Sequence, residues 1–227
     1  MPSPTDPHLE PRSGNLAAFD LDAWLTTAGG LPPVVQAGAE VLRQRAALVD
    51  PALFGSSALH ALIEVMVDVM RRAPGVGLAA PQIGVPLRVF VAEDPEERLV
   101  QLSDDAKAAR RRVALPLLVL VNPTLVPDQS EQLTFFEGCL SVRGYGALVP
   151  RWAAVQVTGV DANGRAVSAS LQGWPARIMQ HEMDHLDGTL YVDRMITRSF
   201  TCEAELGRQS AKPASEVMRE LTLPPLE

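Results

Sequence analysis

The chain is poor in cysteine and has neither a long hydrophobic run nor an excess of basic residues. Its two cysteines, Cys139 and Cys202, are too few for a disulfide framework and are typical of a reducing compartment. The longest apolar run, over 113–121, is too short to cross a bilayer and contains Pro116. The N-terminus shows no basic stretch followed by an apolar core, so no secretory signal is expected. A net charge of −7 argues against a nucleic-acid-binding surface as the main function. These absences predict a soluble cytoplasmic protein.

A length of 227 residues fits one folded domain with extensions. Residues 1–30 are rich in Pro, Ser, Asp and Gly, and we expect a loose arm with at most one short helix near 19–25. Ser56 or Ser57 can cap a helix that ends near residue 72, because apolar side chains recur there with helical spacing. His60 lies beside this stripe and is interpreted as a surface histidine, or one with its hydrogen bonds satisfied, rather than a ligand.

Runs rich in β-branched residues predict strands over 87–93, 117–121 and 155–161. Asn163-Gly164 then predicts a hairpin with a type I′ turn, leading into a strand over 165–171. Residues 94–112 form a charged insertion ending in three arginines, interpreted as a solvated loop or short helix rather than a nucleic-acid patch. Short strands with few helices and no β-α-β alternation predict an α+β fold.

The segment His181-Glu182-Met183-Asp184-His185 is an H-E-x-x-H motif in a stretch that should be helical, with Pro175 in its first turn and Gly188 past its end. Residues four apart lie one above the other on a helix, so the two histidines can bind one metal ion. Glu182 would then act as a base toward the water that the metal activates. Ile178 shares the arc of these residues, whereas an adjacent arc is apolar and can be buried.

The third ligand decides between several kinds of site. The motif can occur by chance on a solvated helix face. A third histidine in the pattern H-E-x-x-H-x-x-G-x-x-H is excluded, because Tyr191 stands at that position. Glu205, about twenty residues downstream, is an alternative that would indicate a metallopeptidase. Cys139 is the better candidate, because one thiolate and two imidazoles leave a fourth tetrahedral position open for water. A single cysteine is otherwise commonly a buried structural thiol.

A glycine-rich segment from Gly75 to Gly84 favours the Cys139 alternative. Residues 75–80 match a loose G-x-G-x-x-A dinucleotide pattern, but they follow a helix and continue through Pro81 into a strand, which is the wrong context. The glycines instead allow close backbone approach to a ligand, and Gln82 supplies an amide that could donate to an oxyanion.

Three segments, in this order, closely resemble the peptide deformylase family: Gly75-Val-Gly-Leu-Ala-Ala-Pro-Gln82, Glu137-Gly-Cys-Leu-Ser141 and Gln180-His-Glu-Met-Asp-His185. The resemblance covers about 31–194 and implies a catalytic domain over 31–198, with extensions over 1–30 and 199–227. It also implies an α+β fold in which small antiparallel or mixed sheets pack around a central metal-binding helix.

The resemblance implies a hydrolase that removes the N-formyl group from the formyl-methionine of newly made polypeptides. One divalent metal ion would be bound by Cys139, His181 and His185. Ferrous iron is the usual metal of the family, and zinc, nickel or cobalt can replace it. Glu182 would be the general base and acid, while the Gln82 side chain and the Leu140 backbone N–H would stabilise the oxyanion. The substrate would be bound by Val76, Gly77 and Ile178.

Some further residues support this site or depart from the family's pattern. Glu137 is interpreted as support for the metal ligands, paired with Arg151, with a surface ion pair of little energetic value as the alternative. Asp184 is interpreted as structural. Arg143 and Gly146 stand where many members carry proline and arginine, which leaves the binding of residues beyond formyl-methionine open. A transient ribosome contact is the one partner implied besides the substrate, but residues 203–227 hold five acidic and three basic residues, unlike a basic ribosome-docking helix. A binding protein that kept the fold and lost the activity is the alternative of another class.

Overall fold

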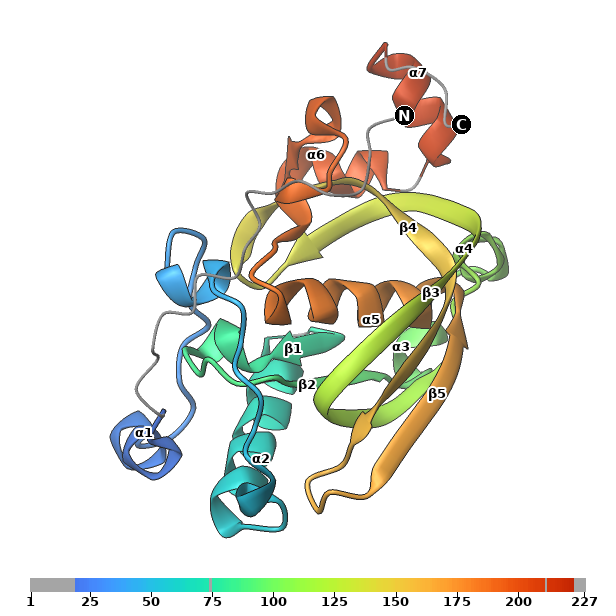
Figure 1. Cartoon of the computed structure of the whole chain (residues 1–227). Coiled ribbons are helices and arrows are strands. Elements are labelled where there is room, and N and C mark those ends of the chain that lie inside the picture. Colours follow the sequence, from blue (N-terminus) through green and yellow to red (C-terminus); the bar gives the residue numbers. More distant parts are fainter. Residues whose placement is uncertain (1–18, 74, 211, 223–227) are drawn as a thin grey trace, which may run out of the picture.

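The computed structural model describes residues 19–73, 75–210 and 212–222 (Figure 1). Its helices are α1 Leu21–Ala28, α2 Ser57–Arg72, α3 Glu96–Leu99, α4 Asp104–Arg110, α5 Gly173–Leu186, α6 Glu203–Gln209 and α7 Ala214–Glu220. Its strands are β1 Gly77–Ala79, β2 Val89–Asp94, β3 Leu115–Cys139, β4 Val142–Val160, β5 Ala166–Gln172 and β6 Thr201–Cys202. The arm predicted over 1–30 lies largely outside the described residues.

One antiparallel sheet runs in the order β1-β2-β3-β4-β5, and β6 pairs with β4. Figure 1 shows α5 crossing the middle of the molecule, with the β3–β4 hairpin curving over it and β1 and β2 beneath. The α+β class predicted from the sequence is confirmed as an antiparallel sheet with helices.

The alternation of side chains along β2 divides the core into two clusters. Val89 and Val91 pack with the apolar stripe of α2, whereas Phe90 and Ala92 pack with α5 on the other face. Successive side chains of a strand point to opposite faces, so one short strand supports both helices. Packing against β2 thereby fixes the position of α5 relative to the sheet.

The helix α2 forms as the sequence predicts, because Ser56 caps it by accepting a hydrogen bond from the Leu59 backbone N–H at 3.2 Å. The short N-terminal helix is also present, with its N-cap at Asp20, although it ends at Ala28 rather than Leu25. The two helices pack against each other through the first core cluster. His60 contacts Asn163 at 3.2 Å, which agrees with its interpretation as a satisfied histidine.

The strands β3 and β4 are much longer than predicted, with 25 and 19 residues. The prediction over 117–121 captured only the start of β3, because residues 127–132 are mostly polar and exposed and have no buried face. A register shift between Asp128 and Gln132 lets the strand bend at that point. A long hairpin is thereby formed from a sequence that contains only short apolar runs.

The hairpin predicted at Asn163-Gly164 is present, but the predicted type I′ turn is wrong. Gly164 has a φ of 77°, whereas Asn163 is not among the described non-glycine residues with positive φ, as a type I′ turn requires. The Asp161 carboxylate accepts hydrogen bonds from the backbone N–H groups of Asn163 and Arg165, at 2.8 and 2.9 Å. This Asx-type bonding stabilises a three-residue loop over 162–164 instead.

The charged insertion over 94–112 folds into α3 and α4, in agreement with the short-helix interpretation. Its three arginines are used within the chain. Arg112 binds the buried carboxylate of Asp94 through two hydrogen bonds of 2.8 and 2.9 Å, and Arg111 pairs with Glu131. The guanidinium of Arg110 lies over the rings of Phe135 and Trp174. Over the described part of the chain, no helix is long and apolar enough to span a bilayer.

Candidate metal centre and active site

The helix α5 presents an apolar side to the sheet and a polar side to the site. Ala176, Met179 and Leu186 are fully buried in the core cluster that includes Phe90 of β2. The polar arc carries His181, Glu182 and His185, as the helical spacing predicts. Packing of one side therefore fixes the direction in which the other side points.

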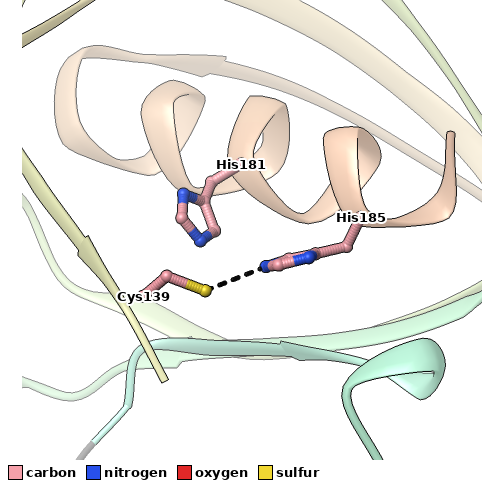
Figure 2. Close-up of side chains that lie close together, drawn as sticks. All are labelled: Cys139, His181 and His185. Atoms are coloured by element: carbon pink, nitrogen blue, oxygen red, sulfur yellow. Dashed lines mark hydrogen bonds between the residues drawn. The ribbon is translucent and has the colours of Figure 1, made fainter. Parts of the chain in front are cut away.

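Cys139 ends β3 and faces this arc (Figure 2). Its Sγ lies 3.2 Å from Nε2 of His185, and the ligand atoms of Cys139, His181 and His185 lie within 4.8 Å of one another. Among the described residues, this is the one group of three such side chains close enough to share a metal ion. A thiolate and two imidazoles are the donors of many tetrahedral metal sites.

The ring of His181 is oriented by Glu137. The Glu137 carboxylate contacts Nδ1 of His181 at 3.0 Å, which leaves Nε2 for a metal. Metal-binding histidines commonly donate their other ring N–H to a carboxylate in this way. Burial and the neighbouring His181 lower the pKa of His185 well below its usual value and favour the neutral ring that binds metals, whereas Cys139 and Glu137 raise the pKa of His181 against the effect of burial.

Glu137 is the centre of a buried ionic network. Arg151 binds it through two hydrogen bonds of 2.9 Å, and Arg177 binds it at 2.6 Å. Burial alone would raise the pKa of Glu137, but Arg151, His181 and Arg177 together hold it well below its ordinary range. Arg151 also binds Asp184 at 2.5 Å. The ion pair predicted between Glu137 and Arg151 is present, and Asp184 has ionic partners at the helix end, since it also pairs with Arg194.

Glu182 lies buried beside the three candidate ligands. Burial raises its pKa to about 7, although His181 opposes the shift. Its Oε2 is buried without a hydrogen-bond partner among the described residues. A Cβ on Gly77 would lie 2.2 Å from Oε1 of Glu182, so a larger residue at this position would force the carboxylate to shift. The glycine predicted to allow close approach thus allows the approach of Glu182.

Gln82 is held so that its amide nitrogen faces Cys139. Its Oε1 accepts a hydrogen bond from the Ala79 backbone N–H at 2.8 Å, which orients the side chain. Its Nε2 then lies 3.6 Å from Sγ of Cys139 and 3.3 Å from the Ser141 hydroxyl. A fixed N–H donor beside a candidate metal site can stabilise an oxyanion.

These groups line one side of a cleft of about 580 Å³. The cleft brings together every site residue predicted from the sequence except His185, which is buried behind its floor. Glu205, the alternative third ligand, does not line the cleft and forms an ion pair with Arg208 on the same helix. Tyr191 stacks against His181 with ring centroids 6.4 Å apart, so it packs on a candidate ligand.

The sequence analysis missed several residues of the site. Arg177 stands four residues before His181 on α5 and was detectable from that spacing as a neighbour on the same face. Ser141, the last residue of the cysteine segment, was given no role, but it is fully buried and contacts Gln82. Glu203 and Leu206 also line the cleft, although they are more than 60 residues from Cys139 in the sequence. No local pattern indicates that last pair.

The chain is similar to several known proteins. Residues 31–200 match the family model described as polypeptide deformylase. "Peptide deformylase 1A, chloroplastic/mitochondrial" of Arabidopsis thaliana is 45% identical over 196 residues, which cover 84% of this chain and 73% of that protein. "Peptide deformylase 1" of Streptomyces coelicolor is 47% identical, over 83% of this chain and 84% of that protein.

Solved structures agree with the sequence relatives. A class I type b peptide deformylase from Acinetobacter baumannii, bound to Met-Ala-Ser, superposes with a TM-score of 0.64 at 34% identity. The match covers 73% of this chain and 98% of that one. With a family model that spans most of the sequence and relatives above 40% identity, this chain belongs to the polypeptide deformylase family.

Proposed function

We propose that this chain is a metal-dependent hydrolase that removes the N-formyl group from the formyl-methionine of newly made polypeptides. The observation that carries the proposal is the convergence of Cys139, His181 and His185 beside the buried carboxylate of Glu182. The reaction adds water across a formamide and yields formate and a free N-terminal amine. Family membership and the relatives' names support this activity.

One divalent cation would be held by Cys139, His181 and His185. Such a cation, when bound, polarises a carbonyl oxygen and makes water a stronger nucleophile at neutral pH. We propose Fe²⁺ from the resemblance to the family, with zinc, nickel or cobalt as substitutes, since these donors suit several of these metals. The support for the site is the donor set itself and the contact of Glu137 with Nδ1 of His181.

Glu182 would take the proton from the attacking water and later deliver it to the leaving amine. Its burial, and its unpaired Oε2, leave it free to accept a proton. A carboxylate with a pKa near 7 is well matched to proton transfer at neutral pH. As the formyl carbon becomes tetrahedral, negative charge would develop on its oxygen, which the Gln82 amide and the Leu140 backbone N–H would stabilise.

The peptide would bind along β1, next to Val76 and Gly77, with the methionine side chain near Ile178. Within the described sheet, β1 is an edge strand that pairs with β2 alone. An extended peptide can add to such an edge through backbone hydrogen bonds. Val76, Gly77 and Ile178 all line the cleft, which supports this placement.

The proposal extends to the domain bounds, the cellular location and the partners of the protein. We assign catalysis to residues 31–198 and treat 1–30 and 199–227 as extensions. A cytoplasmic location fits the two free cysteines, whose side chains form no disulfide. Because the substrate is a nascent chain, a transient contact with the ribosome is the expected encounter. The metallopeptidase alternative has less support, because Glu205 is paired with Arg208.

The direct test is formate release from formyl-Met-Ala-Ser by protein purified anaerobically and loaded with one defined metal at a time. We expect turnover with Fe²⁺, whereas the matching acetyl-Met-Ala-Ser should release neither acetate nor a free N-terminal amine. Glu182→Gln should reduce turnover by about 10²–10⁴-fold with metal content unchanged. Cys139→Ala should abolish metal binding and turnover, whereas Glu205→Ala should leave both intact. Folded protein that releases no formate with any metal would refute the assignment, and it would favour the binding-protein alternative.

A further inference from the structure

Glu203 and Leu206 of α6 line the cleft, and we call this part of its lining the outer wall. The strand β6 pairs with β4 through Tyr145↔Cys202 and Gly146↔Thr201, and α6 begins at the next residue. A Cβ on Gly146 would lie 2.9 Å from Cδ2 of Leu206 and 2.9 Å from the Glu137 carbonyl oxygen. The space beside Gly146 is therefore taken by Leu206, and α6 can pack closely because residue 146 has no side chain.

This wall is fixed by several contacts. Gly138 pairs with Gly146, and the next residue, Cys139, pairs with Val142, so residues 143–145 bulge out of the β3–β4 ladder. Two features tie the bulge to the C-terminal segment: the β6 pairing, and stacking of Tyr145 on Phe200 with centroids 4.9 Å apart at 8°. The position of α6 beside the cleft thus follows from sheet pairing and aromatic packing.

Glu203, the first residue of α6, lines the cleft and is exposed. It has no ion-pair partner among the described residues. The other carboxylates that line the cleft, Glu137 and Glu182, are buried at the candidate metal site. Arg143 is the exposed cation of the lining and lies at the start of the bulge, where its backbone N–H contacts Gln36 at 3.4 Å. The outer wall therefore offers one unpaired carboxylate.

We propose that Glu203 contacts the substrate residues that follow formyl-methionine and favours lysine or arginine at those positions. The inference rests on the proposed function and adds a specificity-determining residue to it. In the proposed function the formyl group lies between Glu182 and Gln82, and the residues that follow formyl-methionine would extend along the same cleft, whose lining includes Glu203 and Leu206. A cationic side chain there would meet the Glu203 carboxylate, while Leu206 beside it would contact the aliphatic stem.

The expected effect is modest, because both partners are partly solvated. Exposed ion pairs contribute about 0.2–1 kcal/mol, which corresponds to a change of about 1.4-fold to fivefold in a specificity ratio. The preference should weaken as salt rises, because a higher salt concentration screens exposed charges.

The test compares C-terminally amidated formyl-Met-Ala-Lys and formyl-Met-Ala-Glu, together with the same pair bearing Lys or Glu directly after methionine. We expect the ratio of kcat/KM for the Lys peptide to that for the Glu peptide to fall by about 1.4-fold to fivefold in Glu203→Gln, and further in Glu203→Lys. Arg143 is present in both wild type and variant, so comparing the two ratios cancels its contribution. Dissociation constants of the deformylated peptides, from calorimetry, should shift in the same sense.

Glu205→Gln is the matched control, because Glu205 lies on the same helix but pairs with Arg208 and does not line the cleft. It should leave the ratio unchanged. Glu203 also stands in the first turn of α6, where a negative charge stabilises a helix. If that were its whole role, Glu203→Gln would change turnover of all the peptides equally. Equal ratios in wild type, Glu203→Gln and Glu203→Lys would overturn the inference, whereas absence of any turnover by the wild type would overturn the proposed function instead.

Discussion

At the scale of single residues, the site depends on a glycine, Gly77, whose lack of a side chain leaves space for Glu182. Gly77 faces Glu182 so closely that a Cβ would lie 2.2 Å from Oε1 and 2.6 Å from Cδ of the carboxylate. Both residues are buried, and Gly77 belongs to β1, so a Cβ at residue 77 would have to displace the side chain of Glu182. The sequence pattern predicted close approach at this glycine, but only the fold shows that Glu182 is the neighbour.

We expect Gly77→Ala to displace Glu182 and to lower kcat/KM for formyl-Met-Ala-Ser by roughly 10²-fold, because a shift of about 1 Å in a catalytic group has effects of this size. Metal content should stay unchanged, since the three atoms nearest to a Cβ at residue 77 belong to Glu182 and not to a candidate ligand. Gly207→Ala is the control, because a Cβ there meets no atom within 4 Å and α6 gains helix propensity. Wild-type activity in Gly77→Ala would contradict the assigned position of Glu182.

At the scale of elements, Glu137 joins two strands and a helix. It lies on β3 and binds Arg151 of β4 and both Arg177 and His181 of α5. A buried carboxylate with these cationic partners is stable as an ion, but removing its charge would leave the buried guanidinium of Arg177 without a counter-charge and that of Arg151 with Asp184 alone. The network therefore has a structural role, and it also orients His181.

We expect Glu137→Gln to lower metal affinity by about 10–100-fold, because it changes the partner of a candidate metal ligand. The apo protein should lose about 3–5 kcal/mol of stability, because Arg177 would be left buried without a counter-charge and Arg151 would keep Asp184 alone. Metal content after dialysis against a chelator and urea unfolding would measure the two effects separately.

The control is Glu131→Gln, which also lies on β3 but pairs with Arg111, and there both side chains are 46–48% exposed. It should leave the free energy of unfolding almost unchanged, because exposed ion pairs contribute little to stability. Unchanged metal retention in Glu137→Gln would show that Glu137 does not support the ligands.

The elements also show where prediction from sequence ends. The capped helix over α2 and the helix carrying the H-E-x-x-H motif were predicted correctly, because helix caps and a 3.6-residue period are local signals. The length of β3 was missed, because its middle is polar and exposed and pairs with β4 alone. The turn at Asn163-Gly164 was assigned the wrong type, because the side chain of Asp161 competes for the backbone N–H groups of the loop.

At the scale of the whole molecule, the three candidate ligands come from two elements that meet only in the fold. Cys139 ends β3, and the two histidines lie on α5 more than 40 residues later. A ligand that binds the folded state and not the unfolded chain stabilises the fold by mass action. Metal binding should therefore raise the free energy of unfolding of the entire domain.

We expect Ni²⁺ or Co²⁺ at 100 times its dissociation constant to add about 2.7 kcal/mol, which corresponds to a rise in Tm of roughly 5–10 °C for a chain of this size. Differential scanning calorimetry of chelator-treated protein, with and without metal, measures this shift. Cys139→Ala should abolish the shift, whereas Cys202→Ala should preserve it, because Cys202 is an exposed thiol on β6. A shift that survives in Cys139→Ala and disappears in Cys202→Ala would exclude the proposed ligand set.

The sequence by itself determined which chemistry is available: two histidines and a glutamate at helical spacing, a cysteine and an amide in glycine-rich segments, and an α+β pattern. These are properties of short stretches, so local spacing is enough to reveal them. Only the tertiary structure decided that Cys139, not Glu205, lies with the histidines, and that Glu137 is held by two arginines. It also placed Glu203 and Leu206 on the wall of the cleft. Such contacts join residues far apart in the chain, and they arise from packing between elements, which leaves no periodic trace in the sequence.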